Sequence, residues 1–462
     1  MSQGWAIVLD VGKTLSKLSL WSRDGRMLDR ATRPNQSTNG VLDTAGTTDW
    51  AIETLKQWAS HPVEYIVPVS HGAAVAGIRG KAPAFATPNY EMELPPHELA
   101  GYREQRDPFA ETGSPALPAG LNLGAQLHML EAQASIPFGS ETLMPYAQYW
   151  AWLLTGVATS EVTSLGCHSD LWNPSSGQFS TMAKRRGWAD RFAPLAKASD
   201  VVGTLKADLA DYIGLPATAK VLAGLHDSNA ALMAARGFAE IADNEATVLS
   251  TGTWFIAMRL AKQSLNLLNL PEARDCLVNV DAYGQPVPSA RFMGGREIES
   301  LIEIDTRRVD IKPDQSHLLS AVDGVVDSMA MVLPTLAPGN GPFPDAAGGW
   351  ANRPTEWYAR RAGACLYAAL VADVSLDLIG SQERLLVEGR FAEAEVFVRA
   401  LASLRPDTKV FTANAHNDVS FGALRLIDPT LQPDGELQQV DPLPEDLTAY
   451  KEAWHERIAG AA

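Results

Sequence analysis

The residue pair with the clearest chemical potential in this sequence is His226 followed by Asp227. Residues 227–235 predict a helix, because the first polar residues can supply a cap for the apolar residues that follow. A carboxylate at such a position can act as a general base if a substrate hydroxyl lies within hydrogen-bond reach. Asp227 could equally serve only as a helix cap, and His226 could be a packed histidine between two backbone groups. The residues alone leave these alternatives open.

A second group of reactive residue types lies near the N-terminus, where residues 10–14 read Asp-Val-Gly-Lys-Thr. Gly12 lets the backbone approach a phosphate closely, while Thr14 and nearby N–H groups can donate hydrogen bonds to its oxygens. Asp10 could hold a magnesium ion through water, and Lys13 could add positive charge. An ordinary turn is the alternative, because Asp and Gly are common turn residues.

The Gly-Lys-Thr order also resembles part of a Walker A loop, but two features argue against that motif. Walker A requires a glycine five positions before its Gly-Lys pair, and Ile7 stands there. A helix must follow that motif, whereas residues 15–28 alternate and turn like a β-hairpin. We therefore expect a hairpin loop that binds phosphate through backbone amides and hydroxyls.

A similar pattern recurs half a chain later. The strand-like residues 247–249 lead into Ser250-Thr251-Gly252-Thr253, and residues 254–258 continue as a strand. We expect Gly252 and Thr253 to hold a transferring phosphate through backbone amides and a hydroxyl. Two such units predict an internal duplication into two similar domains, residues 1–243 and 244–462. Two unrelated hairpins remain the alternative.

Helices and strands in alternation surround these loops and would position them. We expect helices over 125–133, 145–154 and 360–379, short buried strands over 385–387 and 409–411, and a final core helix over 419–427. The Pro-rich stretches 83–96 and 108–118 predict loops. This mixture of elements predicts an α/β protein.

Composition narrows the class of protein. Of the 462 residues, 46% are hydrophobic and 20% are charged, which is typical of a folded globular protein. The net charge of -16 argues against a nucleic-acid or anionic-membrane surface. No apolar run approaches the roughly 18 residues needed to span a bilayer, and no signal peptide is evident. The three widely spaced cysteines suit neither a disulfide framework nor a zinc site, so we expect a cytoplasmic protein.

The order of these motifs resembles that of the FGGY family of carbohydrate kinases, which belong to the superfamily of actin, hexokinase and Hsp70 ATPases. The resemblance runs from Ile7 to about Leu426, nearly the whole chain. The segments that carry it are Leu9–Gly12, Met144-Pro145 with Leu153–Gly156, Ala223–Asp227, Leu249–Thr253, Met293–Gly295, the Pro/Gly-rich stretch Leu333–Gly349, Glu388–Arg390 and Ala413–Ala423.

The resemblance implies two actin-like, RNase H-like α/β domains with a cleft between them, and ATP and Mg²⁺ as cofactors. It implies that Asp227 is the catalytic base, that His226 orients the sugar, and that Asp10 and Asp227 hold the metal. Arg390 departs from the family pattern, which usually has consecutive glycines there, and it could stack on the base of the nucleotide. The residues expected on the adenosine side are Gly295, Glu299, Gly389, Arg390 and Asn414.

Sugar contacts are expected from two further segments. His71 and Gly72 follow the apparent strand 65–69, at the place where the family has substrate contacts. Tyr90 and Glu91 lie in a Pro-rich loop and offer an aromatic face and a carboxylate, which are groups that orient a polar ligand. Each of these residues could equally be an ordinary loop residue.

The predicted function is transfer of the γ-phosphate of ATP to a hydroxyl of a small sugar. The His-Asp pair resembles that of kinases acting on deoxyketohexoses such as rhamnulose or fuculose, so a ketose is the first expectation. A pentulose (xylulose or ribulose) or a polyol is the second. The alternative class is a phosphohydrolase or a chaperone-like ATPase of the same superfamily. We expect a sugar and ATP as partners, with no nucleic acid and no membrane, and the apolar content permits a homodimer without requiring one.

Overall fold

The computed structural model describes residues 5–133, 138–262, 266, 269–302, 309–413 and 419–461. The chain forms two compact units, each assembled from three segments. Unit 1 comprises Met1–Gly237, Val278–Pro286 and Asn417–Pro433, and unit 2 comprises Phe238–Leu277, Val287–His416 and Asp434–Ala462. The first passage between the units falls at residues 237–238, and the expected domain division after residue 243 stays a prediction.

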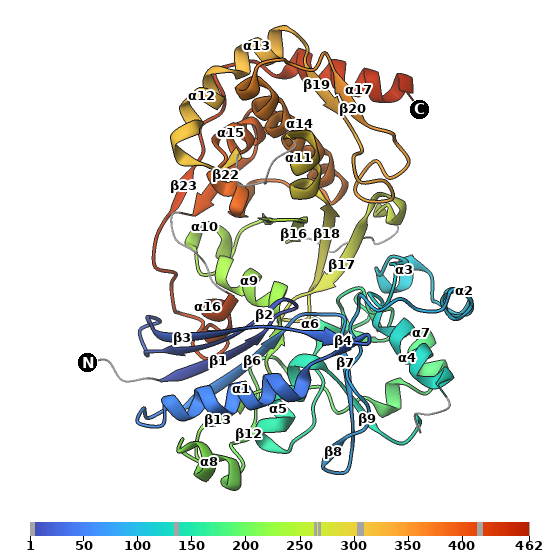
Figure 1. The fold of residues 1–462 in the computed structure, drawn as a ribbon, viewed down its shortest axis with the longest axis vertical. Coiled ribbons are helices and arrows are strands. Elements are labelled where there is room, and N and C mark those ends of the chain that lie inside the picture. The colour runs from blue at the N-terminus through green and yellow to red at the C-terminus, as the bar shows by residue number, and fades with distance from the viewer. Residues whose placement is uncertain are drawn as a thin grey trace. The chain divides into compact units, whose positions relative to one another are not determined.

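Unit 1 is built on a seven-stranded mixed sheet (Figure 1). Its strands are β1 (Ala6–Val11), β2 (Leu15–Trp21), β3 (Met27–Pro34), β6 (Tyr65–Ser70), β12 (Val201–Thr204), β13 (Lys220–Leu222) and β14 (Leu225–His226). β1, β2 and β3 form an antiparallel meander, and β6 adds to β1 in parallel. β13 and β14 both run parallel to β6, while β12 is antiparallel to β13. The carboxyl ends of β1, β6 and β14 therefore lie at one edge of the sheet.

A second seven-stranded sheet repeats this topology, mostly within unit 2. Its strands are β15 (Ala246–Thr251), β16 (Phe255–Leu260), β17 (Cys276–Val280), β18 (Pro286–Phe292), β21 (Arg384–Gly389), β22 (Lys409–Ala413) and β23 (Leu437–Gln439). β15, β16 and β18 form the antiparallel meander, and β21 and β22 add in parallel. The two predicted phosphate loops each join the first and second strands of a meander, as expected for a duplicated fold.

Helices cover both faces of the unit 1 sheet. Alternate residues of a strand point to opposite faces, so neighbouring residues of β1 pack in different apolar clusters. Ile7 and Leu9 pack with α1 (Thr44–Gln57) and α5 (Tyr146–Thr155) in one apolar cluster. Ala6 and Val8 pack with α9 (Asp227–Ala235) and α16 (Val419–Leu424) in another. Figure 1 shows these helix pairs on opposite sides of the sheet. The predicted strand over residues 6–9 is thus a buried central strand.

The remaining elements of unit 1 form small sheets and short helices around this core. They are β4 (Ser37–Thr38), β5 (Val41–Leu42), β7 (Val75–Arg79), β8 (Ala82–Pro83), α2 (Pro96–Arg103), α3 (Phe109–Thr112), α4 (Leu123–Ala132), β9 (Thr142–Pro145), α6 (Val162–Leu165), β10 (Trp172–Asn173), β11 (Gln178–Phe179), α7 (Thr181–Arg185), η1 (Ala189–Arg191) and α8 (Ala207–Ile213).

In unit 2 the long helix α14 (Trp357–Leu378) packs against the sheet, and its residues share one apolar cluster with Leu249 of β15 and Val387 of β21. The other elements are α10 (Ala239–Ala242), η3 (Glu272–Arg274), α11 (Gly294–Ile302), η5 (Lys312–Asp314), α12 (Gln315–Ser320), α13 (Val322–Asp327), β19 (Met331–Leu333), β20 (Gly349–Ala351), η6 (Arg390–Glu393), α15 (Glu395–Leu404) and α17 (Thr448–Ala461).

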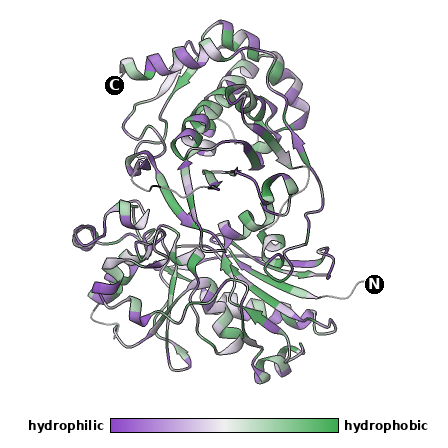
Figure 2. Ribbon diagram, turned by 180° about the vertical axis from the view of Figure 1, so that it is seen from behind, coloured by the Kyte–Doolittle hydropathy of each residue, from purple (hydrophilic) through white to green (hydrophobic). Residues whose placement is uncertain are grey.

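The predicted helices agree with α4, α5, α9, α14 and α16, with small differences at their ends. Hydrophobic residues gather on the central strands of both sheets, while many loops are hydrophilic (Figure 2). Cys167, Cys276 and Cys365 are buried and free, which confirms that they form no disulfide framework. Among the helices in the described ranges, none has the length and apolar character needed to cross a membrane.

Candidate active site

The first loop, which joins β1 to β2, has a shape that requires glycine. The N–H of Gly12 donates to the carbonyl of Leu15 at 3.2 Å. A Cβ on Gly12 would lie 2.8 Å from that carbonyl oxygen, so a side chain would force the loop open. Asn35 supports the loop from outside, because its Nδ2 donates to the Gly12 carbonyl at 2.6 Å and its backbone N–H donates to Thr14 at 2.8 Å. Sequence reasoning missed Asn35, which carries no motif of its own.

The charged residues of the first loop are engaged within unit 1. The buried carboxylate of Asp10, near the end of β1, lies 3.2 Å from Nζ of Lys17. Nζ of Lys13 lies 2.9 Å from the Glu91 carboxylate and 5.0 Å from the centre of the Tyr90 ring. The structure therefore brings Lys13 beside two residues that the sequence predicted on the sugar side.

Asp227 is the first residue of α9, directly after β14. His226 occupies the N-cap position without a side-chain capping bond, and the Asp227 carboxylate accepts the backbone N–H of Ser228 at 2.6 Å. Nε2 of His226 lies 3.1 Å from the Asp227 carboxylate, and the Asp227 side chain is 29% exposed. A substrate hydroxyl can therefore reach this carboxylate. The first turn of a helix also favours a negative charge there.

The electrostatics keep Asp227 ionised. Burial would raise the pKa of Asp227, but the hydrogen bond and positive charge of His226 outweigh burial and hold that pKa below its ordinary value. Burial also opposes charge on His226, yet the neighbouring Cys167 and Asp227 raise the pKa of its imidazole well above normal. The pair is an imidazolium beside a carboxylate, which keeps Asp227 in the ionised form that a general base needs before it accepts a proton.

The predicted sugar residues gather around this pair. β6 and β14 are parallel with Ser70 opposite His226, so His71 and Gly72 lie at the same sheet edge as Asp227. A Cβ on Gly72 would lie 2.8 Å from Nε2 of His226, which explains why glycine is needed there. The buried His71 ring packs 5.5 Å from the Tyr90 ring, between centres. Burial lowers the pKa of His71, so its ring is neutral near pH 7.

Sequence reasoning missed a group of buried side chains that hold the segment of Asp227. Thr163 Oγ1 accepts a hydrogen bond from the backbone N–H of His226 at 2.9 Å. The same hydroxyl donates to the Glu161 carboxylate, which also accepts from the Thr163 N–H at 3.0 Å. Burial raises the pKa of Glu161 to about 7, against the hydrogen bonds from Thr163. These residues connect α6 to the start of α9.

Two further residues near the sugar side were also missed. Gln126 is fully buried, and its Nε2 donates to the carbonyls of Ala73 at 2.7 Å and Gly120 at 2.6 Å, which fixes the chain next to Gly72. Sγ of Cys167 lies 4.0 Å from Nε2 of His226. Isolated polar residues of this kind give no periodic or motif signal in a sequence.

In unit 2 the second loop joins β15 to β16 and is enclosed by glycines. The N–H of Gly252 donates to the carbonyl of Trp254 at 3.0 Å. A Cβ on Gly295 would lie 2.1 Å from the Gly252 carbonyl oxygen, and one on Gly389 would lie 2.2 Å from the Thr251 carbonyl oxygen. Both glycines predicted on the adenosine side thus pack directly against the loop that contains Gly252 and Thr253.

The other residues predicted on the adenosine side are less closely associated with this loop. Arg390 is exposed at the start of η6, one residue after Gly389. Glu299 is exposed on α11, whereas Glu297 is buried and accepts hydrogen bonds from the Thr335 hydroxyl at 2.6 Å and the Leu336 N–H at 2.9 Å. Asn414 lies outside the described residues.

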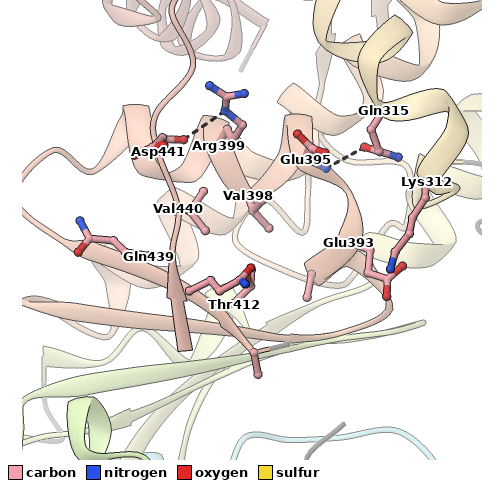
Figure 3. Close-up of a pocket in the computed structure, with 13 residues that line it drawn as sticks. Lys312, Gln315, Glu393, Glu395, Val398, Arg399, Thr412, Gln439, Val440 and Asp441 are labelled. Carbon is pink, nitrogen blue, oxygen red and sulfur yellow. Dashed lines mark hydrogen bonds between the residues drawn. The ribbon is translucent and has the colours of Figure 1, made fainter. Parts of the chain in front are cut away.

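A cavity of about 760 Å³ in unit 2 lies where η6 and α15 meet the carboxyl end of β22. Figure 3 shows Lys312 and Glu393 at one end of this cavity and Gln439 at the other. Gln315 accepts a hydrogen bond from the backbone N–H of Glu395 at 2.9 Å and so joins α12 to the start of α15. The cavity is lined by amide, carboxylate and small apolar groups together with the cationic side chains of Lys312 and Arg399, and such a mixture can receive a flat polar ring.

Comparison with known proteins identifies the family to which this architecture belongs. A profile described as the C-terminal domain of carbohydrate kinase FGGY matches residues 243–434. The crystal structure of a carbohydrate kinase from Novosphingobium aromaticivorans is 61% identical in sequence, matches over 100% of both chains and superposes with a TM-score of 0.97. The chain belongs to the FGGY family of carbohydrate kinases.

Other relatives of this FGGY kinase are more distant. A xylulose kinase from Lactobacillus acidophilus has a TM-score of 0.79 over 99% of this chain and 98% of its own, but only 12% identity, so it supports the fold alone. An L-fuculokinase from Salmonella typhi is 36% identical over 107 residues, which is 23% of this chain and 21% of that protein. The chain matches only about a fifth of the length of that relative.

Membership of the family makes the protein a sugar phosphotransferase that uses ATP, with two actin-like domains. For the metal, no group of three or more His, Cys, Asp or Glu side chains that could hold an ion occurs in the described ranges. Magnesium in kinases is commonly bound by one or two carboxylates together with phosphate oxygens and water. Asp10 and the residue before Asp227 lie on strands that end at the same sheet edge, and binding of magnesium by these two carboxylates stays a prediction.

Proposed function

We propose that this FGGY kinase phosphorylates a ketose, such as a deoxyketohexose, with Asp227 as the general base. The observation that carries the proposal is the ionised Asp227 carboxylate, reachable from solvent and 3.1 Å from His226, beside the aromatic and imidazole groups of Tyr90 and His71. The local match to an L-fuculokinase supports a deoxyketohexose as the first substrate class.

The reaction assigned to the site is in-line transfer. Asp227 accepts the proton of the attacking sugar hydroxyl as the new oxygen–phosphorus bond forms and the bond between the β- and γ-phosphates of ATP breaks. We assign the sugar contacts to His71, Gly72, Tyr90, Glu91 and His226. The low pKa of Asp227 means that the base is ready at neutral pH.

Phosphate binding is assigned to the two hairpin loops. Backbone amides of Gly12 and Gly252 and the hydroxyls of Thr14 and Thr253 can donate to phosphate oxygens, because both loops turn at a glycine. Lys13 can add charge to the first loop. Mg²⁺ bound by Asp10 and Asp227 would neutralise charge on the transferring phosphate.

The adenosine end of ATP is assigned to unit 2. Two residues that line the cavity shown in Figure 3 are close in sequence to predicted adenosine residues. Ala392 follows Arg390 by two residues, and Ala413 directly precedes Asn414. We propose that this cavity receives the adenine or ribose, with Gly295 and Gly389 shaping its approach and Arg390 and Glu299 at its exposed side.

The test is an ADP-release assay with ATP and Mg²⁺ against ketohexoses, deoxyketohexoses, pentuloses, aldoses and polyols. Wild type is compared with Asp227→Ala and with Asp208→Ala, an exposed acid in the first turn of α8 that serves as a matched control. We expect release that depends on a ketose, disappears with Asp227→Ala and survives with Asp208→Ala.

Other outcomes of this assay are informative. Preference for xylulose, ribulose or a polyol would contradict the deoxyketohexose assignment while keeping the role of Asp227. Sugar-dependent release that survives Asp227→Ala would overturn the general base. Release without any sugar would indicate a phosphohydrolase or a chaperone-like ATPase.

A further inference from the structure

Unit 1 contains a second cavity, of about 630 Å³, that includes none of the residues assigned to the sugar. Val162 of α6, Met233 of α9, Leu195 and Leu426 supply apolar walls. Leu195 is 48% exposed although it is a large hydrophobic residue. An apolar recess of this size is suited to the body of a small organic molecule.

The charged groups of this cavity are predominantly positive. Arg425 and Lys197 line it, together with Asp200, whose carboxylate already accepts the backbone N–H of Lys197 at 2.8 Å. Tyr283 also lines it and is 57% exposed. The cavity thus combines apolar walls, an aromatic ring and two cationic side chains.

Arg425 is the strongest indication that this cavity binds an anion. Its side chain is 9% exposed, and its terminal nitrogens donate to the backbone carbonyls of Leu431 and Arg236. Its Nε is buried and has no hydrogen-bond partner, and Arg425 forms no ion pair within the described ranges of the chain. The nearby Arg236 is already paired with Asp281 at 2.7 Å. Burying a guanidinium donor without an acceptor costs free energy, which an anionic ligand would recover.

The segment 195–200 connects this cavity to the catalytic segment by backbone hydrogen bonds. The N–H of Ala196 donates to Ser160 at 2.9 Å, and Ser160 directly precedes Glu161. On the other side, the N–H of Gly224 donates to Ala198 at 3.1 Å, and Gly224 lies two residues before His226. A shift of this segment would therefore move both supports of Asp227, the Glu161–Thr163 contact and the start of β14.

We propose that this cavity is a second ligand site, which binds a small organic anion with an apolar body and alters the rate of the kinase through the segment 195–200. The anionic group lies against Arg425 and Lys197, and the apolar body lies against Val162, Leu195 and Met233. The anion is a carboxylate or a phosphate monoester, since a guanidinium and an ammonium bind both.

Binding is tested by calorimetry on the full chain with phenylacetate and phenyl phosphate as probes. Leu195→Glu adds a negative charge at an exposed position of the cavity, and Val157→Glu makes the same change at another exposed aliphatic residue of unit 1 that does not line it. We expect Leu195→Glu and Lys197→Ala to weaken binding by about tenfold or more, because like charges repel and an ion contact is lost. Val157→Glu should bind as wild type does.

The two probes together distinguish a carboxylate ligand from a phosphate ester. Binding of phenylacetate alone would indicate a carboxylate ligand, and binding of phenyl phosphate alone a phosphate ester. Absence of binding by both at millimolar concentration, or binding that Leu195→Glu leaves unchanged, would overturn the site.

The effect on the reaction is measured separately by ADP release with the best sugar. A probe that binds should change kcat in wild type and in Val157→Glu but not in Leu195→Glu. Binding without any change in kcat or KM would overturn the proposed coupling. Because calorimetry needs no turnover, failure of the sugar or base assignment would remain distinguishable from failure of this site.

Discussion

The two hairpin loops of this kinase occupy the same place in one topology yet carry different chemistry. Each loop follows the first strand of its meander and is closed by a hydrogen bond from its glycine, Gly12 to Leu15 at 3.2 Å and Gly252 to Trp254 at 3.0 Å. In unit 1 the sheet edge that holds this loop also carries the titratable side chains of His71, His226 and Asp227. The unit 2 loop is instead enclosed by two other glycines.

This difference separates two tasks. In unit 1 the carboxyl ends of two parallel strands carry imidazole groups. His71 follows β6, and His226 is the last residue of β14. In unit 2 the corresponding places near Thr251 keep the backbone clear of side chains, as Gly389 does. In the function proposed above, one copy of the fold would supply an acid–base group, and the other would supply backbone surface for a nucleotide.

The largest expected effect breaks the chemistry of unit 1. Asp227→Asn keeps the shape of the side chain but cannot accept a proton, so kcat should fall by about 10²- to 10⁴-fold. Sugar affinity, measured by calorimetry, should change little because the amide still forms hydrogen bonds. A normal kcat in Asp227→Asn would show that unit 1 does not supply the base.

The next effect breaks the backbone surface of unit 2. Gly295→Ala places a Cβ about 2.1 Å from the Gly252 carbonyl oxygen, so the loop must move. We expect the free energy of unfolding to fall by about 1–3 kcal/mol and ATP affinity by about tenfold. Gly324→Ala is the matched control, since a Cβ at Gly324 in α13 meets nothing within 4 Å. Equal ATP affinity in both variants would contradict the role of this loop.

A smaller effect tests the support of Asp227. Thr163→Val removes the hydroxyl that accepts from the His226 N–H at 2.9 Å. We expect kcat to fall by about 10- to 100-fold with little change in KM, because a small displacement of a catalytic group is costly. Thr163→Ser keeps the hydroxyl and should restore kcat. If serine were as damaging as valine, packing of the methyl group would be the cause instead.

The smallest effect is a displacement of a pH profile. Burial raises the pKa of Asp227, and the hydrogen bond and charge of His226 are the largest of the effects that hold it below its ordinary value. His226→Asn removes the imidazolium, so the pKa of Asp227 should rise. Because the base works only when ionised, the acid limb of kcat should move to higher pH. A limb at the wild-type pH would mean that another group lowers the pKa of Asp227.

Local patterns were sufficient for much of the fold. Alternation over residues 15–28 predicted the hairpin that became β2 and β3, and the apolar run 6–9 predicted the buried strand β1. The helix at 227–235 was correct as well. Periods of two and 3.6 residues are set by backbone geometry, and they can be read without any long-range contact.

Contacts between distant residues explain what could not be predicted. Asn35, Thr163 and Gln126 hold loops through hydrogen bonds to backbone groups 23, 63 and 53 residues away. A single asparagine, threonine or glutamine has no pattern that names such a partner. Their role exists only once the strands are aligned.

The sequence by itself determined the two glycine loops, the strand–loop–strand order and the His226-Asp227 pair, because these depend on residues close together in the chain. Only the tertiary structure decided what each glycine makes room for. Gly72 admits the imidazole of His226, while Gly295 admits the carbonyl of Gly252. A missing Cβ is visible in the sequence, but the atom that occupies its space comes from a segment that only folding brings near.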